Sequence, residues 1–197
     1  MLMLCEVNYV RIKWIGFMNV ETGLKIEKIN FYDDVTLLVG LSGVGKTQIL
    51  NAIEYSLNLA VRKDIILRPY DVSIGIYVDD IEYVWSYRIK SVPNDDLILE
   101  NQDKYNFVYE SLMKDGDLVF ERNQDMINVV GYDKVPQPKK DESLLSQYSE
   151  DKKFEKLISG IRKLYSVEIE LAVRGGISSE NFSRLKTKVI ETIKKNK

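Results

Sequence analysis

Residues 35–59 limit the possible folds of this chain more than any other stretch, because they join three segments with different structural preferences. An apolar run, VTLLVG, is followed by GLSGVGKT and then by QILNAIEYSLNL. A short apolar run bounded by glycine is typical of a strand buried on both faces of a parallel sheet, and the last segment has the apolar spacing of a helix. The sequence therefore predicts a strand, a glycine-rich loop and a helix in succession.

The glycine-rich loop fits the pattern G-x-x-x-x-G-K-[ST] with Gly40, Gly45, Lys46 and Thr47. Glycines let the backbone approach a phosphate closely. The unpaired N–H groups at the start of a helix then favour an anion. The Lys46 ammonium is expected to reach the β- and γ-phosphates, and the Thr47 hydroxyl to bind Mg²⁺. The alternative is a glycine turn that holds no ligand.

Composition excludes several kinds of site. The chain has 197 residues, enough for one sizeable domain, and its 28 Lys and Arg against 30 Asp and Glu give no overall basic signal for nucleic acid. Cys5 is the one cysteine and histidine is absent, which excludes disulfides, zinc clusters and histidine-based catalysis within one chain. No apolar run has the length of a membrane span, and the N-terminus does not resemble a secretion signal, so we expect a cytoplasmic protein.

Alternating apolar and polar residues predict antiparallel strands on both sides of the loop. Residues 4–31 have the pattern of a β-hairpin, and residues 71–130 read as mostly antiparallel β. Asp79 and Asp80 end one alternating run just before the next begins. This periodicity favours a hairpin turn over the acidic strand that holds Mg²⁺ in phosphate-loop enzymes.

The C-terminal part reads as loop, helix, strand and helix. We predict a nucleotide-binding core with an antiparallel β lobe over residues 1–134, a proline-containing linker over 135–148 and a helix-strand-helix segment over 149–197, with its strand at 165–173. The last helix carries a basic face made of Arg184, Lys186, Lys188, Lys194, Lys195 and Lys197. That face is either a solvated helix surface or a nucleic-acid contact, and the first interpretation is favoured.

The order of these elements resembles the N-terminal half of the ABC-type ATPase head of RecF, structural-maintenance-of-chromosomes and overcoming-lysogenization-defect (OLD) proteins. The resemblance rests on GFMNV at 16–20, on INFYDDVTLLVGLSGVGKTQILNAI at 29–53 and on VYESL with GDLVFER at 108–122. It implies an α/β phosphate-loop NTPase fold with an N-terminal β-hairpin region and an antiparallel β lobe. It further implies a role in DNA maintenance or anti-phage defence.

The resemblance also assigns site residues. It implies that ATP and Mg²⁺ are bound by Gly40, Leu41, Ser42, Gly43, Val44, Gly45, Lys46, Thr47 and Gln48. Asn19 would lie near the nucleotide. Gln147 would contact Mg²⁺ and the attacking water, its alternative being an ordinary surface glutamine. Ser42 departs from the family, which usually has asparagine there.

The sequence contains no LSGGQ-like signature, no apolar strand ending in Asp-Glu after the loop and no switch histidine. We therefore expect ATP binding without fast hydrolysis, in part of a longer protein or a short subunit. A second ATPase head or partner subunit would complete the site, and nucleic acid would be contacted through that partner or the basic helix. The alternatives are a non-enzymatic, nucleotide-dependent interaction module and a self-contained phosphate-loop kinase supported by Arg62, Arg68 and the Asp79–Asp80 pair.

Overall fold

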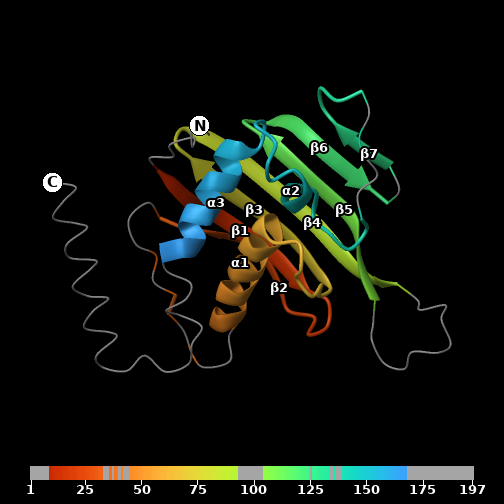
Figure 1. Ribbon diagram of the computed structural model, residues 1–197. Coiled ribbons are helices and arrows are strands. Elements are labelled where there is room, and N and C mark those ends of the chain that lie inside the picture. Colours follow the sequence, from red (N-terminus) through yellow and green to blue (C-terminus); the bar gives the residue numbers. More distant parts are fainter. Residues whose placement is uncertain are drawn as a thin grey trace, which may run out of the picture.

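The computed structural model describes residues 9–32, 36, 38–39, 41, 45–92, 104–124, 126–133, 135 and 139–167, with the side chains of residues 104 and 165–167 excepted. These residues form one seven-stranded sheet in the order β2-β1-β3-β4-β5-β6-β7, and every neighbouring pair is antiparallel (Figure 1). The strands are β1 (Val10–Asn19), β2 (Lys25–Asn30), β3 (Tyr70–Val78), β4 (Ile81–Val92), β5 (Lys104–Lys114), β6 (Asp117–Asn123) and β7 (Met126–Val129).

The predicted hairpin over residues 71–90 is confirmed as β3 and β4, which are joined by Asp79 and Asp80. Asp79 has a left-handed backbone, φ 51°, as two-residue hairpin turns require. Its carboxylate accepts a hydrogen bond from the Tyr9 N–H at 3.0 Å and forms an ion pair with Lys156 at 2.8 Å. The acidic pair therefore belongs to a turn.

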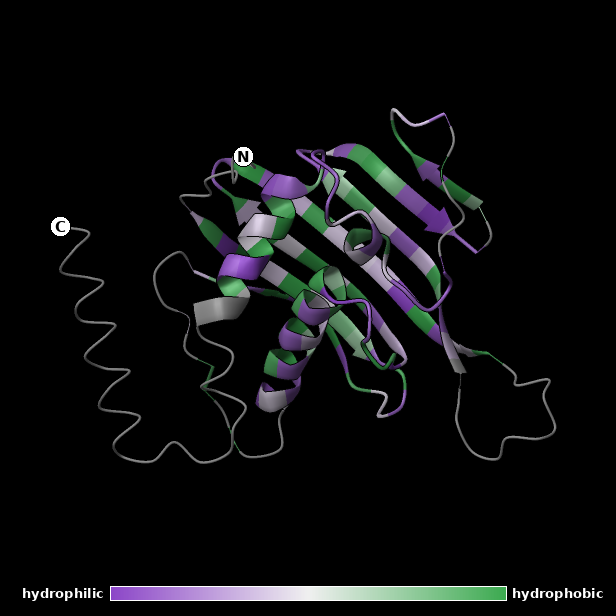
Figure 2. Ribbon diagram, viewed as in Figure 1, coloured by the Kyte–Doolittle hydropathy of each residue, from purple (hydrophilic) through white to green (hydrophobic). Residues whose placement is uncertain are grey.

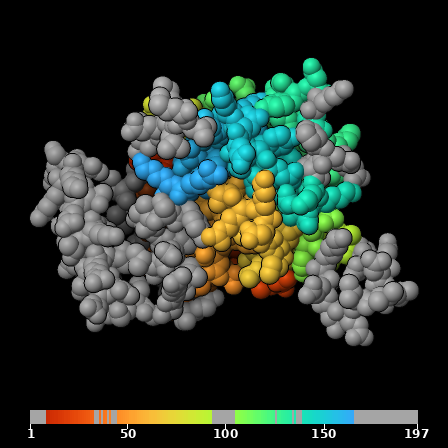
Figure 3. All heavy atoms as spheres, viewed as in Figure 1, coloured from red at the N-terminus to blue at the C-terminus, as the bar shows by residue number. Residues whose placement is uncertain are grey.

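Three helices cover one face of the sheet: α1 (Lys46–Val61), α2 (Leu144–Gln147) and α3 (Glu155–Val167) (Figures 1 and 3). Alternate strand residues point to this face, so the strands change between apolar and polar along their length (Figure 2). Ile74, Ile76, Trp85 and Tyr87 are buried there. Among the described residues, no helix combines the length and apolar character needed to cross a membrane.

The prediction of an α/β phosphate-loop NTPase fold with parallel strands is wrong for the part of the chain that the structure describes. Thr36, Leu38 and Val39, from the run expected to form a parallel strand, belong to no strand. Helix α1 leads from the loop into β3, which pairs antiparallel with β1 and β4. An apolar run can become a buried parallel strand only where parallel neighbours exist, and the described sheet offers none.

The antiparallel segments were predicted, but as two regions rather than one sheet. β1 pairs with β3 from Val10↔Val78 to Asn19↔Tyr70, which joins the N-terminal hairpin to the later strands. The strand expected from Tyr165 is also wrong at its start, because α3 continues through Val167. The remainder of that strand and the basic helix at 178–197 lie outside the described residues.

Candidate functional site

The first turn of α1 coincides with the GKT of the loop motif. Gly45 is the N-cap residue and has φ 92° and ψ 8°, a left-handed conformation that residues other than glycine adopt only at an energetic cost. Among the described residues, no side chain caps this end of the helix, and its first turn has no acidic residue. The helix therefore presents backbone donors and the positive end of its dipole where the motif requires them.

One described residue of the loop, Leu41, contacts the same end of the helix. The Lys46 ammonium donates a hydrogen bond to the Leu41 carbonyl oxygen at 2.6 Å. Thr47 is exposed, whereas Lys46 and Gln48 are half-buried. Lys46, Thr47 and Gln48 thus lie together at the first turn, and Gly40, Ser42, Gly43 and Val44 lie outside the described residues.

Asn19 is the last residue of β1 and precedes the turn to β2. Its side-chain oxygen accepts hydrogen bonds from the N–H groups of Glu21 at 3.0 Å and Thr22 at 3.1 Å, and its amide nitrogen donates to the Tyr70 hydroxyl at 3.3 Å. The turn reaches the loop through Leu24, whose Cδ2 would lie 3.3 Å from a Cβ built on Gly45. Asn19 is therefore tied to the loop through this turn, while its own amide is used to shape the turn.

Gln147 is the last residue of α2, and its amide nitrogen donates to the Glu142 carbonyl at 3.2 Å. α2 packs against α1 beside the end of α1 that leads into β3 (Figure 1). The 16 residues of α1 span about 24 Å, and Lys46 is the first residue of the helix, at the end away from α2. The structure thus does not bring Gln147 to the first turn of α1, and its role at Mg²⁺ stays a prediction.

The arginines that would support a kinase are also away from the loop. Arg62 is the C-cap residue of α1, at the opposite end from Lys46. Arg68 lies in the segment that leads into β3, and its backbone N–H donates to the Tyr55 hydroxyl at 2.7 Å. Within the described ranges, no group of three or more Asp, Glu or Cys side chains is placed to hold a metal ion.

A polar cluster that the sequence analysis did not assign lies under α2. Glu110 is fully buried and accepts hydrogen bonds from Trp85 Nε1 at 3.2 Å, from the Ser143 hydroxyl at 2.7 Å and from the Leu144 N–H at 2.9 Å. Arg122 Nη2 lies 3.4 Å from Glu110 Oε2 and donates to the Glu142 carbonyl at 2.9 Å. The pair therefore clamps the start of α2 onto β5 and β6.

The environment of the pair decides its electrostatics. Burial raises the pKa of the Glu110 carboxyl, against the effect of Arg122 and of the donors from Leu144 and Ser143. Burial likewise lowers the pKa of Arg122, which Glu110 opposes. The signal in the sequence was the pair VYESL and VFER, since Glu110 and Arg122 are directly opposite in the β5–β6 ladder.

A scan against protein-family models finds no matching family, and a search of curated proteins finds no significant match. The resemblance to RecF and OLD proteins therefore rests on the sequence motifs alone and stays a prediction.

Proposed function

We propose that this chain binds ATP with Mg²⁺ through residues 40–48, as the nucleotide-binding part of a cytoplasmic RecF/OLD-like ATPase acting in DNA maintenance or anti-phage defence. The observation that carries the proposal is the coincidence of motif and geometry at Gly45 and Lys46. A left-handed glycine precedes a helix that begins with the motif lysine, and that lysine donates a hydrogen bond to the carbonyl of Leu41, a residue of the motif.

Electrostatics support an anionic ligand at this position. The start of a 16-residue helix carries backbone N–H groups and a positive dipole end, and no capping side chain of a described residue and no acidic residue of the first turn competes for an anion there. Lys46 adds a full positive charge to the same place. A triphosphate that displaces the Leu41 carbonyl from Lys46 exchanges a neutral acceptor for a charged one, which strengthens the hydrogen bond.

Hydrolysis needs groups beyond these. Phosphoryl transfer to water requires an oriented water and a stabilised leaving charge in addition to the bound metal. Asp79, the first acidic residue of the β3–β4 turn, is held by Tyr9 and Lys156. We therefore place the remaining catalytic groups on a second ATPase head or partner subunit, and any contact with nucleic acid on that partner or on the basic helix at 178–197.

Isothermal titration of the full chain with MgATP tests the proposal. We expect Lys46→Ala to weaken binding by about 10- to 100-fold, as loss of a charge-assisted hydrogen bond does. The matched control is Lys63→Ala, an exposed lysine just beyond the other end of α1. Equal affinity of wild type and Lys46→Ala would contradict the site. Rapid phosphate release by the isolated chain, abolished by Lys46→Ala, would instead contradict the need for a partner.

One observation also favours the alternative of a non-enzymatic, nucleotide-dependent interaction module. Three large apolar residues near the loop are strongly exposed: Tyr32 at 80%, Val39 at 76% and Leu41 at 82%. Exposed large apolar side chains can mark a surface that contacts another protein. If nucleotide acts only as a signal, size-exclusion chromatography will show ATP-dependent association with a partner and no phosphate release even when that partner is present.

A further inference from the structure

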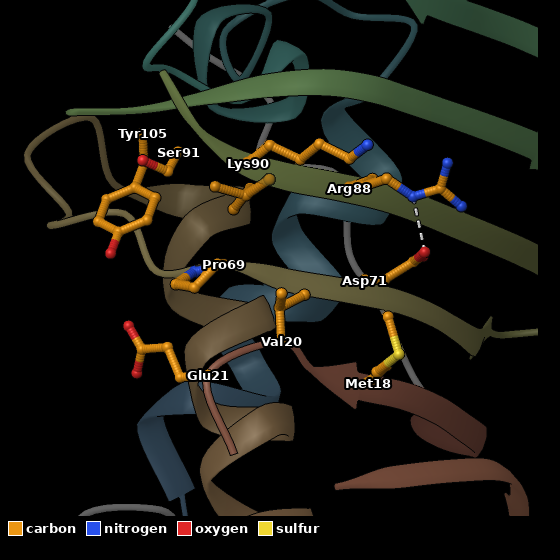
Figure 4. A pocket seen from close by; sticks show the side chains of 10 residues that line it. Met18, Val20, Glu21, Pro69, Asp71, Arg88, Lys90, Ser91 and Tyr105 are labelled. Carbon is orange, nitrogen blue, oxygen red and sulfur yellow. Dashed lines mark hydrogen bonds and ion pairs between the residues drawn. The ribbon is translucent and has the colours of Figure 1, made fainter. Parts of the chain in front are cut away.

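A cavity of about 590 Å³ lies at the end of the sheet where β3 begins (Figure 4). One side of it is formed by consecutive residues of β4, including Ile89, Lys90 and Ser91. The other side is formed by Val20 and Glu21 of the β1–β2 turn together with Pro69. The cavity therefore separates β4 from the turn at the point where β3 no longer lies between them.

The strand ladders show why the cavity exists. β4 pairs with β5 as far as Val92↔Lys104, whereas its pairing with β3 stops at Asp71↔Arg88. Within the described part of the chain, residues 89–92 consequently have a neighbouring strand on one side only. Sheet edges of this kind offer backbone donors and acceptors to another extended segment.

The direction of the backbone groups follows from the hairpin. Val78 and Ile81 flank a two-residue turn and so exchange both hydrogen bonds, after which alternate residues of β4 face β3. This alternation directs the N–H and C=O of Ser91, and the C=O of Ile89, toward the cavity. The Tyr70 N–H, which would have met Ile89, donates instead to the Arg68 carbonyl at 2.8 Å. Among the described residues, no backbone bond outside the ladders involves residues 89–92.

We propose that this gap is a recognition site for an extended segment of a partner protein, which adds a short strand beside Ser91, antiparallel to β4. Main-chain hydrogen bonds to Ser91 would supply affinity, and side-chain positions on the two faces would supply specificity. The proposal is independent of nucleotide binding, because it concerns the end of the sheet and none of residues 40–48.

The side chains around the gap define the segment. Lys90 is exposed and forms no ion pair with a described residue, so the partner residue opposite it is expected to be acidic. The partner residue opposite Ser91 shares its face with Tyr105, the cross-strand neighbour of Ser91, and is expected to be apolar. A second copy of this chain would bring two Lys90 ammonium groups close together, which argues for a different protein as partner.

Titration of the full, ¹⁵N-labelled chain with the hexapeptide TVEVTV, followed by amide chemical shifts, tests the proposal. We expect shifts centred on Ser91 and weaker binding of the peptide TVKVTV. Ser91→Pro removes the N–H that faces the gap and leaves the β5 ladder intact, so it should weaken binding about tenfold, whereas Ser91→Ala should not. Lys90→Glu should reverse the preference between the two peptides.

Four results would overturn the proposal. The first is the absence of shifts at residues 89–92 with either peptide. The second is unchanged binding by a folded Ser91→Pro variant. The third is shifts at residues 89–92 that depend on protein concentration without peptide, which would indicate that a second copy of this chain binds there. The fourth is a Ser91 amide already protected from hydrogen exchange in the free chain, which would indicate that another part of the same chain fills the gap. Far-ultraviolet circular dichroism of Ser91→Pro checks that the sheet is retained.

Discussion

Two cations of this chain each donate to loop carbonyls, but in opposite surroundings. Lys46 reaches the Leu41 carbonyl at the open end of α1, next to an exposed Thr47. Arg122 reaches the Glu142 carbonyl beneath α2, with 2% of its side chain exposed, and pairs with a fully buried Glu110. In the proposed function, Lys46 exchanges the Leu41 carbonyl for a ligand. Arg122 cannot move away without leaving the buried Glu110 carboxylate unpaired.

The contrast between Lys46 and Arg122 shows how a charged binding residue can be distinguished from a charged structural residue. A buried ion pair stabilises a particular arrangement only while both partners remain, and removal of one is costly. A cation at the surface contributes little to stability and keeps its capacity for ligands. The two regions should therefore respond in opposite ways to substitution: stability for the Glu110–Arg122 pair, and nucleotide affinity for the loop.

The largest expected effect is on stability, from Arg122→Leu. This change leaves the Glu110 carboxylate buried without its partner and should lower the free energy of unfolding by about 3–5 kcal/mol. Urea denaturation measures it. The same substitution in a Glu110→Gln background should cost clearly less, because a neutral amide needs no cation. The control is Arg88→Leu, which breaks an exposed ion pair with Asp71 and should cost about 0–1 kcal/mol. An equal loss of stability in Arg122→Leu and Arg88→Leu would contradict the distinction between the buried and the exposed ion pair.

A smaller effect of the same pair is its pH dependence. Because burial raises the pKa of Glu110 above its ordinary 4.5, the folded protein holds this proton more tightly than the unfolded chain. The resulting stabilisation is complete below pH 4.5 and is lost as pH rises through the raised pKa. The free energy of unfolding of wild type, relative to Glu110→Gln, should thus fall with rising pH in urea titrations. A constant or rising difference would contradict the assigned direction.

At the open region, Gly45→Ala should cost about 1–2 kcal/mol, since φ 92° is strained for alanine. The added methyl would also press against Leu24 Cδ2, 3.3 Å away. Gly116→Ala is the matched control, because it has φ 89° and open space around its Cβ position. Thermal and urea unfolding compare the two variants. Only Gly45→Ala should also weaken MgATP binding, and equal binding by both variants would separate Gly45 from the nucleotide site.

The smallest effect should be that of Lys46→Ala on stability, within about 0.5 kcal/mol, because its hydrogen bond to Leu41 is exposed. Urea denaturation of this variant beside Arg122→Leu gives the sharpest form of the comparison. A loss as large as that of Arg122→Leu would make Lys46 a structural residue.

Residue patterns along the chain were enough to predict several of the local elements. Alternation predicted the β3–β4 hairpin and its turn at Asp79–Asp80, and the helix expected at the start of residues 149–197 corresponds to α3, which begins later, at Glu155. The glycine pattern predicted a helix starting near Lys46. These features follow from neighbours within a few positions along the chain, which is the range over which periodicity and turn chemistry act.

The assembly of these elements depends on contacts between residues that are far apart in sequence. The apolar run at 35–40 favoured a parallel strand, yet strand direction depends on partners that lie far away in sequence. The same reason explains the Glu110–Arg122 pair and the gap at Ser91. The first is set by the β5–β6 register and the position of α2, and the second by the point at which β3 departs from β4. Local preference fixes which residues can form a strand, whereas register and packing fix what each strand meets.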